Sequence, residues 1–323
     1  MKRALSVLLP AALVLAGATS ILTARKASAE DAAADVAERN ERCGIRVFTA
    51  MVGESVTPEV ISGTAPQASF DTLVKDKRFV ERFSSYVNSK MNRTPGATPA
   101  EDATYYVTKY VLENEKPWAD MFIGQYKVAP SDPMKDDSPA VVTADPAGLG
   151  YFRSDAWAKR YAGNEGEGIR IVTAYRIMQN TIGLTLEATT NAPEADISKT
   201  GREVGVCKGC HYANFYALDK VAGVLGRTKR DKDGKITFEP PPAAKQTILS
   251  DRLVANDAEL VRELVKSEGF SVNACRLAYG YLYGRSEYSC DGPVFDACVT
   301  AFKADGRIQS ALAAVARNAG FCE

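Results

Sequence analysis

Apolar positions recur at helical spacing along most of the chain. In residues 69–88 they lie three or four positions apart, which predicts a helix with one buried face. Residues 102–112 are also expected to be helical, although their tyrosines would suit a strand. A third helix is predicted by an apolar stripe formed by Ile171, Tyr175, Met178 and Ile182. The pattern therefore indicates a mainly α fold.

The C-terminal region has the clearest helical pattern. Asn256 is expected to cap a helix, and Glu259 completes a capping box three residues later. Gly269 is expected to end that helix, because glycine is common just after a helix. Three more helices are expected after it, over residues 271–283, 294–303 and 307–317.

A segment over residues 129–150 is the best internal boundary, because it contains four prolines and four aspartates. A loop of this length in a compact domain is usually either functional or a linker. We therefore expect a mostly helical N-terminal domain over residues 30–145. A second domain, built from short helices, is expected over residues 146–323.

Residues 1–29 are typical of a signal peptide. Two basic residues precede an apolar run over residues 4–22, and residues 27–29, Ala-Ser-Ala, form a small-residue cleavage signal. The alternative is an uncleaved membrane anchor, but the run contains a proline and a glycine that would weaken a spanning helix. We expect a periplasmic or otherwise exported protein with no membrane span after cleavage.

Charge argues against one class of partner. The chain has 40 basic and 40 acidic residues. The signal segment holds four of the basic residues and no acidic one, so 36 basic and 40 acidic residues remain after cleavage, a net charge of −4. Nucleic acid is therefore not an expected partner, because its phosphates attract basic proteins.

The run Cys207-Lys208-Gly209-Cys210-His211 has the pattern C-x-x-C-H, which is typical of c-type haem attachment. Each thiol can add across one vinyl group of a porphyrin, and the adjacent histidine can bind the iron as proximal ligand. We therefore expect one covalent haem c, held by Cys207, Cys210 and His211. Export agrees with this expectation, since bacteria attach haem c outside the cytoplasm.

Three other interpretations of the motif stay open: a thioredoxin-like dithiol, half of a zinc site, and a disulfide pair. A redox dithiol should follow a strand in a βαβ pattern, and the sequence shows none. A zinc site usually needs a second ligand pair, whereas His211 is the only histidine and no second C-x-x-C exists. These points favour haem.

The other five cysteines are disulfide candidates in an oxidising compartment; they are Cys43, Cys275, Cys290, Cys298 and Cys322. An odd number allows at most two disulfides within the chain. We expect both among the C-terminal four cysteines, where Cys290 and Cys298 would close a short loop. Cys43 is then expected to be the unpaired thiol.

The second axial ligand of the iron cannot be another histidine of this chain. No methionine follows residue 178, so a methionine ligand must come from Met51, Met91, Met121, Met134 or Met178. Met178 is the nearest in sequence and is our candidate, although a methionine on an apolar stripe often only packs in a core. Otherwise the iron is five-coordinate, or is capped by lysine, tyrosine or water.

Part of the chain resembles a group of uncharacterised exported bacterial cytochrome-like proteins. The resemblance is carried by the single C-x-x-C-H motif, by residues 277–285 (Leu-Ala-Tyr-Gly-Tyr-Leu-Tyr-Gly-Arg), and by a final helix. It covers about the last 150 residues, and only the haem motif within it is specific. It implies haem binding and electron transfer, and it indicates no substrate.

Together these features predict an exported mono-haem c-type cytochrome-like protein that transfers electrons to redox partner proteins. One alternative is a five-coordinate haem enzyme, or a gas or redox sensor; another is a partner-binding protein in which haem is structural. A peroxidase-like mechanism usually relies on a distal histidine, which this chain lacks.

Overall fold

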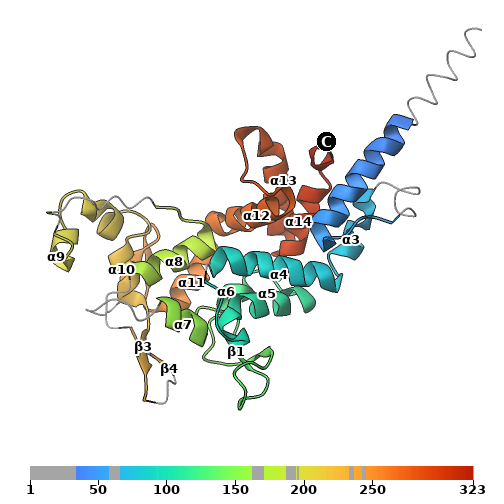
Figure 1. Ribbon diagram of the computed structural model, residues 1–323. Coiled ribbons are helices and arrows are strands. Elements are labelled where there is room, and N and C mark those ends of the chain that lie inside the picture. Colours follow the sequence, from blue (N-terminus) through green and yellow to red (C-terminus); the bar gives the residue numbers. More distant parts are fainter. Residues whose placement is uncertain are drawn as a thin grey trace, which may run out of the picture.

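The computed structural model describes residues 34–57, 66–92, 94–161, 171–186, 194, 196–232, 236–241 and 245–322. The protein is mainly helical, as predicted, and is elongated (Figure 1). Among the described residues the strands form three antiparallel two-stranded hairpins. The expected signal peptide lies outside the described residues. Within them, no helix is long and apolar enough to cross a membrane.

The N-terminal half begins with a helix over residues 34–52. The sequence predicts one helix over residues 69–88, but the structure has two, α3 (Phe70–Leu73) and α4 (Lys77–Met91). The helix breaks because Asp76 has an extended backbone and caps α4, its carboxylate accepting a hydrogen bond from the Arg78 backbone N–H at 2.8 Å.

Residues 102–112 are helical, as predicted. All of them except Asp102, the N-cap, belong to α5 (Ala103–Glu113), whose buried positions lie three or four residues apart and which packs against α4. The short helix α6 (Asp120–Ile123) follows. The expected loop over residues 129–150 contains most of a hairpin instead, in which β1 (Tyr126–Pro130) pairs with β2 (Ala140–Ala144).

The central part of the chain consists of short elements. Helices α7 (Asp155–Tyr161) and α8 (Ile171–Ile182) come first, and the predicted stripe at residues 171–182 is thus a helix. The remaining elements are α9 (Lys199–Arg202), a π-helical turn (Gly209–Ala213), α10 (Leu218–Val224), the hairpin of β3 (Arg227–Arg230) and β4 (Ile236–Glu239), and the hairpin of β5 (Gln246–Ile248) and β6 (Arg252–Val254).

Four helices complete the chain: α11 (Asp257–Val265), α12 (Glu268–Tyr283), α13 (Gly292–Asp305) and α14 (Ile308–Ala316). The predicted cap is present, since the Asn256 side chain accepts a hydrogen bond from the Glu259 backbone N–H at 2.9 Å. The expectation for Gly269 is wrong. It lies inside α12, because α11 already ends at Val265 and Ser267 is the N-cap of the next helix.

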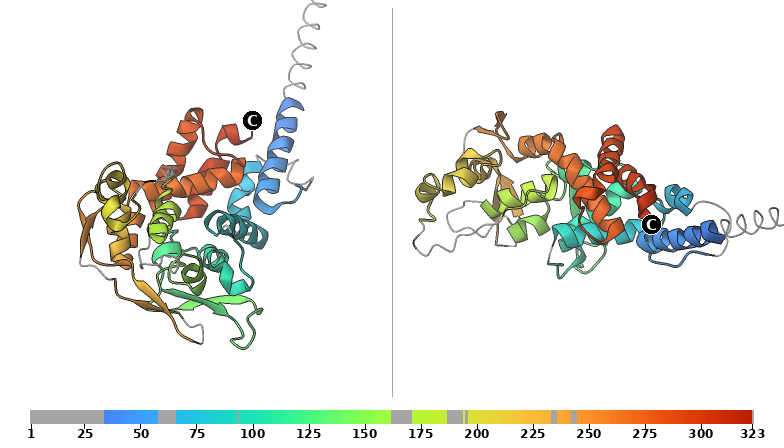
Figure 2. Two further views of the ribbon diagram at one scale, coloured as in Figure 1. Left: turned by 60° about the vertical axis from the view of Figure 1, so that its left-hand side comes forward. Right: turned by 90° about the horizontal axis from the view of Figure 1, so that it is seen from above.

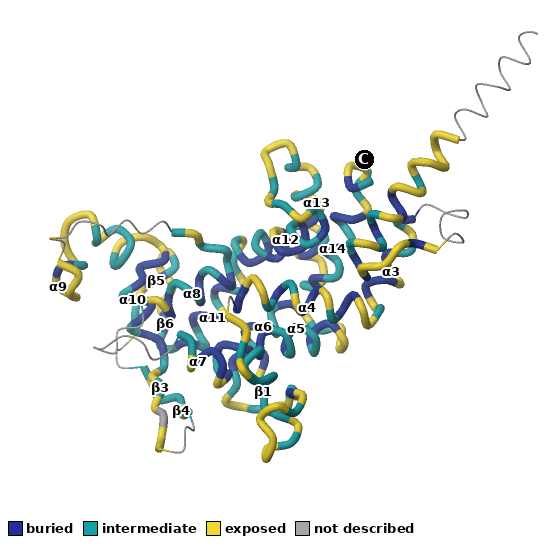
Figure 3. Tube along the Cα trace, in the orientation of Figure 1, coloured by how far each residue is buried: buried dark blue, intermediate teal, exposed yellow. Residues whose placement is uncertain are grey.

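The buried side chains form one hydrophobic cluster that includes residues on both sides of position 145. At its centre aromatic rings from distant segments meet. Phe83 of α4 contacts Tyr281 of α12 at 5.0 Å between ring centres, and Phe122 of α6 contacts Phe270 of α12 at 5.6 Å. Figure 3 shows the buried positions along the middle of the body and the exposed ones at its ends and hairpin tips. The division into domains at residue 145 stays a prediction.

The disulfide expectations are partly wrong. Cys43 is bonded to Cys322, and Cys275 is bonded to Cys298, whereas Cys290 is an exposed free thiol. Cys43 is paired because the helix over residues 34–52 lies beside the C-terminus (Figure 1). Cys298 pairs with Cys275 rather than with Cys290 because α13 packs against α12. The expected limit of two disulfides agrees with the two that the described residues form.

We expect Cys43→Ser to lower the free energy of unfolding by about 2–5 kcal/mol, because the Cys43–Cys322 bond closes a very long loop. Urea unfolding of the unreduced protein measures this. Cys290→Ser is the matched control and should change stability by less than about 0.5 kcal/mol. Equal stability of the Cys43 variant and the wild type, or alkylation of Cys43 in the unreduced denatured wild type, would contradict the assignment.

Candidate haem-binding site

The C-x-x-C-H motif lies between α9 and α10 at one end of the molecule. The helix over residues 34–52 lies at the other end, and both views of Figure 2 show this separation. Helix α10 packs against α8 and against strand β5, which connects the motif region to the body. Ser198 caps α9 by accepting a hydrogen bond from the Gly201 backbone N–H at 3.2 Å.

The motif itself has an unusual backbone. Cys210 and His211 belong to the π-helical turn, which closes when the Asn214 backbone N–H donates to the Gly209 carbonyl at 2.8 Å. Short π-helical turns occur often at functional sites. The backbone breaks after the π turn, and α10 begins only at Leu218.

Both motif cysteines are free thiols and half-buried. The Cys210 sulfur lies 3.4 Å from the Tyr216 hydroxyl oxygen, which also accepts a hydrogen bond from the Asn214 side-chain amide at 2.8 Å. The hydrogen bond with Cys210 raises the pKa of Tyr216, so the tyrosine stays protonated near neutral pH. The Cys210 thiol is therefore positioned by a local contact, and both thiols are available for bonding to another group.

His211 is held by a carboxylate. Its Nδ1 lies 2.6 Å from Oδ2 of Asp219, which is in the first turn of α10. A carboxylate only accepts hydrogen bonds, so Nδ1 carries a proton, and in the neutral imidazole Nε2 is the nitrogen that can bind a metal ion. This orientation is typical of a histidine that binds a metal ion through its second ring nitrogen.

Asp219 is also paired with Arg202 of α9. The guanidinium donates from Nη2 to Oδ1 at 2.9 Å and from Nε to Oδ2 at 3.2 Å. The side chains are only 12% exposed for Arg202 and 5% for Asp219, so solvent screens the pair weakly. Burial, followed by the negative charge of Asp219, raises the pKa of the neighbouring Tyr212 to about 12. One carboxylate thus connects α9, the π turn and α10.

Large apolar side chains are exposed around the motif. Val206, directly before Cys207, is 95% exposed, and Ile197, Val204 and Phe215 are 71%, 60% and 46% exposed. Clustered exposed apolar residues commonly mark a binding surface. A flat apolar group attached at Cys207 and Cys210 would remove part of this surface from water, at roughly 25 cal/mol per Å².

The residues at this site fit a haem c. They supply two thiols at the right spacing, one imidazole with its Nε2 available, a carboxylate that orients the imidazole, and apolar side chains beside them. Asp219 and Arg202 were not apparent from the sequence. Neither lies at a motif spacing, and only the packing of α9 and α10 brings them to His211.

Comparisons with protein families, curated proteins and solved structures find no match to this chain.

Met178 lies on α8 and is completely buried in the hydrophobic core. The helix that carries it packs against α10, which follows the motif. Among the other candidates, Met51 and Met121 are fully buried, while Met134 is 89% exposed. Thr108 donates a hydrogen bond to the Met121 sulfur at 3.4 Å, which gives that sulfur a structural partner. A ligand role for Met178 stays a prediction.

Arg202→Gln and Asp219→Asn are each expected to lower the free energy of unfolding by about 3 kcal/mol, because each leaves a buried charge without its partner. The double variant should lose less than the sum of the two, since it removes both charges. Urea unfolding measures all three losses. Lys303→Gln, which removes an exposed ion pair with Glu268, should cost less than about 1 kcal/mol. Strictly additive losses at Arg202 and Asp219 would show that the two side chains are not coupled.

Proposed function

We propose that this protein is an exported c-type cytochrome that carries one haem c and transfers electrons to redox partner proteins. Cys207 and Cys210 would hold the haem covalently, and His211 would bind its iron. The observation that carries the proposal is the hydrogen bond from His211 Nδ1 to Asp219 within a C-x-x-C-H motif, because it directs Nε2 away from the protein's own carboxylate.

Attachment needs no oxidant. At each cysteine, the sulfur would form a bond to one carbon of a vinyl group, and the thiol hydrogen would add to the other carbon. Both cysteines are free thiols, as this addition requires. When bound, the haem supplies a reversible one-electron change at iron.

The residues around His211 would shift the reduction potential of the bound iron. The Asp219 carboxylate accepts a hydrogen bond from the Nδ1–H group of His211, which would make the imidazole a stronger electron donor and favour oxidised iron. Arg202 neutralises part of the Asp219 charge and limits this effect. The low exposure of the pair excludes water from the carboxylate, so the hydrogen bond to His211 is maintained without competition from solvent.

Two observations support export and haem over the alternatives. The two disulfides fit an oxidising compartment outside the cytoplasm, where haem c is attached. The described residues contain no group of three or more His, Cys, Asp and Glu side chains arranged to hold a metal ion, which weighs against the zinc interpretation of the motif. The alternatives are a five-coordinate haem enzyme or sensor, and a haem with a structural role. They are distinguished from the proposal by whether a second protein ligand would bind the iron.

Covalent attachment is tested on protein made in cells that mature c-type cytochromes. The denatured protein should keep its haem stain on a gel, because thioether bonds survive denaturation. The double variant Cys207→Ala/Cys210→Ala should lose the stain completely. Cys290→Ala, which removes an exposed thiol away from the motif, should keep it. Haem that extracts from the wild type into acidified organic solvent would contradict the proposal.

The distal ligand is tested with Met178→Leu, which keeps an apolar side chain of similar volume in the core. If Met178 binds the iron, the variant should lose the weak sulfur-to-iron absorption band, have a lower reduction potential and bind carbon monoxide. Met134→Leu, at an exposed position, should leave all three properties unchanged. A wild-type protein that binds carbon monoxide readily and lacks the band would exclude methionine ligation and favour the five-coordinate enzyme or sensor.

A further inference from the structure

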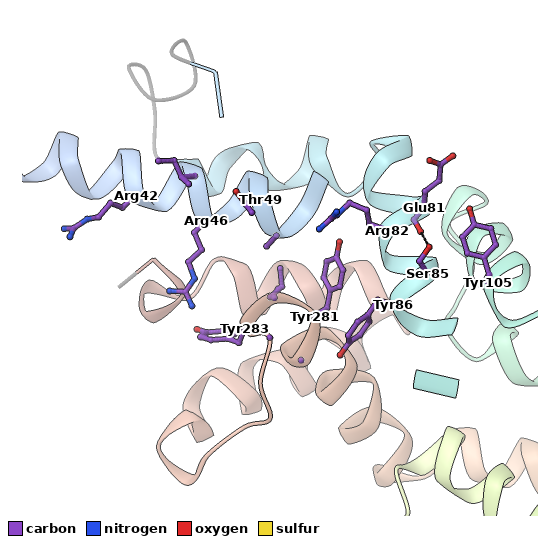
Figure 4. Close-up of a pocket in the computed structure, with 15 residues that line it drawn as sticks. Arg42, Arg46, Thr49, Glu81, Arg82, Ser85, Tyr86, Tyr105, Tyr281 and Tyr283 are labelled. Atoms are coloured by element: carbon purple, nitrogen blue, oxygen red, sulfur yellow. Dashed lines mark hydrogen bonds between the residues drawn. The ribbon is translucent and has the colours of Figure 1, made fainter. Parts of the chain in front are cut away.

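A second candidate site lies at the end of the molecule opposite the C-x-x-C-H motif. It is a groove of about 1150 Å³ between the helix over residues 34–52, α4 and the end of α12 (Figure 4). The side chains that matter to the argument are Arg42, Arg46, Arg82, Tyr86, Tyr281 and Tyr283. Nothing in the proposed haem chemistry uses this groove.

The groove has an excess of positive charge. Three arginines line it, against the single carboxylate of Glu81. That carboxylate lies 3.6 Å from the amine of Lys109 and 3.8 Å from the amine of Lys77, so its charge is already compensated. Within the part of the chain that the structure describes, Arg42 is paired with Glu38 at 3.7 Å, whereas neither Arg46 nor Arg82 forms an ion pair with an acidic side chain. An anion would therefore find two uncompensated guanidinium groups.

The guanidinium group of Arg46 stacks on two aromatic rings. The central guanidinium carbon of Arg46 lies 4.7 Å from the ring centre of Phe321 and 5.2 Å from that of Tyr283. Such stacking fixes the plane of an arginine while leaving its N–H groups free to donate. Figure 4 shows Arg46 directed toward Tyr283, and Arg82 directed into the space beside Tyr281.

Tyr86 and Tyr281 form one side of the groove, which we call the aromatic wall. The rings of Tyr86 and Tyr281 meet edge to face, with their centres 5.3 Å apart. The Tyr281 hydroxyl donates to the Met51 carbonyl at 3.2 Å, while no hydrogen bond of the Tyr86 hydroxyl to a described residue is found. Burial raises the pKa of Tyr86 to about 12, so this hydroxyl is a neutral donor at physiological pH.

A glycine lets Tyr86 reach this position. A Cβ atom on Gly280 would lie 2.6 Å from the Tyr86 hydroxyl oxygen, which is far inside normal contact distance. Only glycine therefore allows the hydroxyl to lie against α12 at the floor of the groove. Gly280→Ala is expected to displace Tyr86 and change the shape of the wall.

We propose that this groove binds a small aromatic carboxylate. The arginines would donate to its carboxylate, and the tyrosine rings would pack against its ring. The groove is somewhat larger than most small-molecule sites, so it has room for a ring as well as a carboxylate, whereas an inorganic anion would leave the aromatic wall uncovered. An aliphatic anion would gain the charge interaction but not the ring packing.

The test is titration calorimetry on the full-length protein with four probes. Benzoate should bind, whereas benzamide, which has the ring without the charge, and acetate, which has the charge without the ring, should bind at least about tenfold more weakly. Arg46→Gln and Arg82→Gln should each weaken benzoate binding by about tenfold or more. The fourth probe, a short oligoglutamate peptide, represents an acidic protein partner and should bind more weakly than benzoate.

Two further variants separate binding from folding. Arg46→Lys keeps the positive charge but removes the planar guanidinium that stacks on the aromatic rings. It should weaken benzoate binding less than Arg46→Gln does. Arg252→Gln removes an exposed arginine of β6, outside the groove, and should leave binding unchanged. Circular dichroism establishes that each variant is folded.

The proposal is overturned if benzoate fails to bind folded wild-type protein at millimolar concentration, or if it binds Arg46→Gln and Arg82→Gln as tightly as the wild type. Oligoglutamate binding that needs both arginines, without benzoate binding, would make the groove a surface for acidic proteins instead. Acetate binding as tightly as benzoate would show that the aromatic wall has no role. Because the haem stain on a gel does not depend on this groove, the two proposals succeed or fail separately.

Discussion

The buried carboxylate of Asp219 is the interaction on which the motif region depends. Helices α9 and α10 and the π turn between them are each too short to be stable alone. Asp219 joins the three by accepting hydrogen bonds from Arg202 and His211. A buried ion pair contributes little net stability compared with apolar packing, but it penalises any arrangement that separates its partners. Its effect here is to set the orientation of His211.

Helix α8 transmits that arrangement to the rest of the protein. It packs against α10 on the motif side and against α11 and α12 in the body. At its end the Asn273 side chain donates to the carbonyls of Asn180 and Thr181, both at 3.1 Å. These hydrogen bonds satisfy backbone groups that a helix terminus leaves unpaired. Helix α8, whose end is capped from α12, is therefore one main attachment of the motif region to the aromatic core, beside the packing of α10 against β5 and α11.

The exposed apolar side chains around Cys207 connect the proposed cofactor to the stability of this region. Without a bound group, Val206, Val204, Ile197 and Phe215 are exposed to solvent. If haem c is attached as proposed, it would cover such side chains and add contacts that the short helices lack. Cofactor attachment and local order would then be coupled, as they are in small domains that fold around a metal. The arginine-lined groove at the other end has no such dependence, since it lies between long helices of the body.

The sequence alone determined the mainly helical fold class, the C-x-x-C-H motif and the limit of two disulfides, because each depends on local spacing or on a count of residue types. The periodicity identified α5 and α8, and the capping box of Asn256 identified the start of α11. Only the tertiary structure decided that Cys43 pairs with Cys322, that Asp219 holds His211, and that Arg46 and Arg82 face one groove. Each of these joins residues from separate elements, and no local pattern in a sequence records which elements pack together.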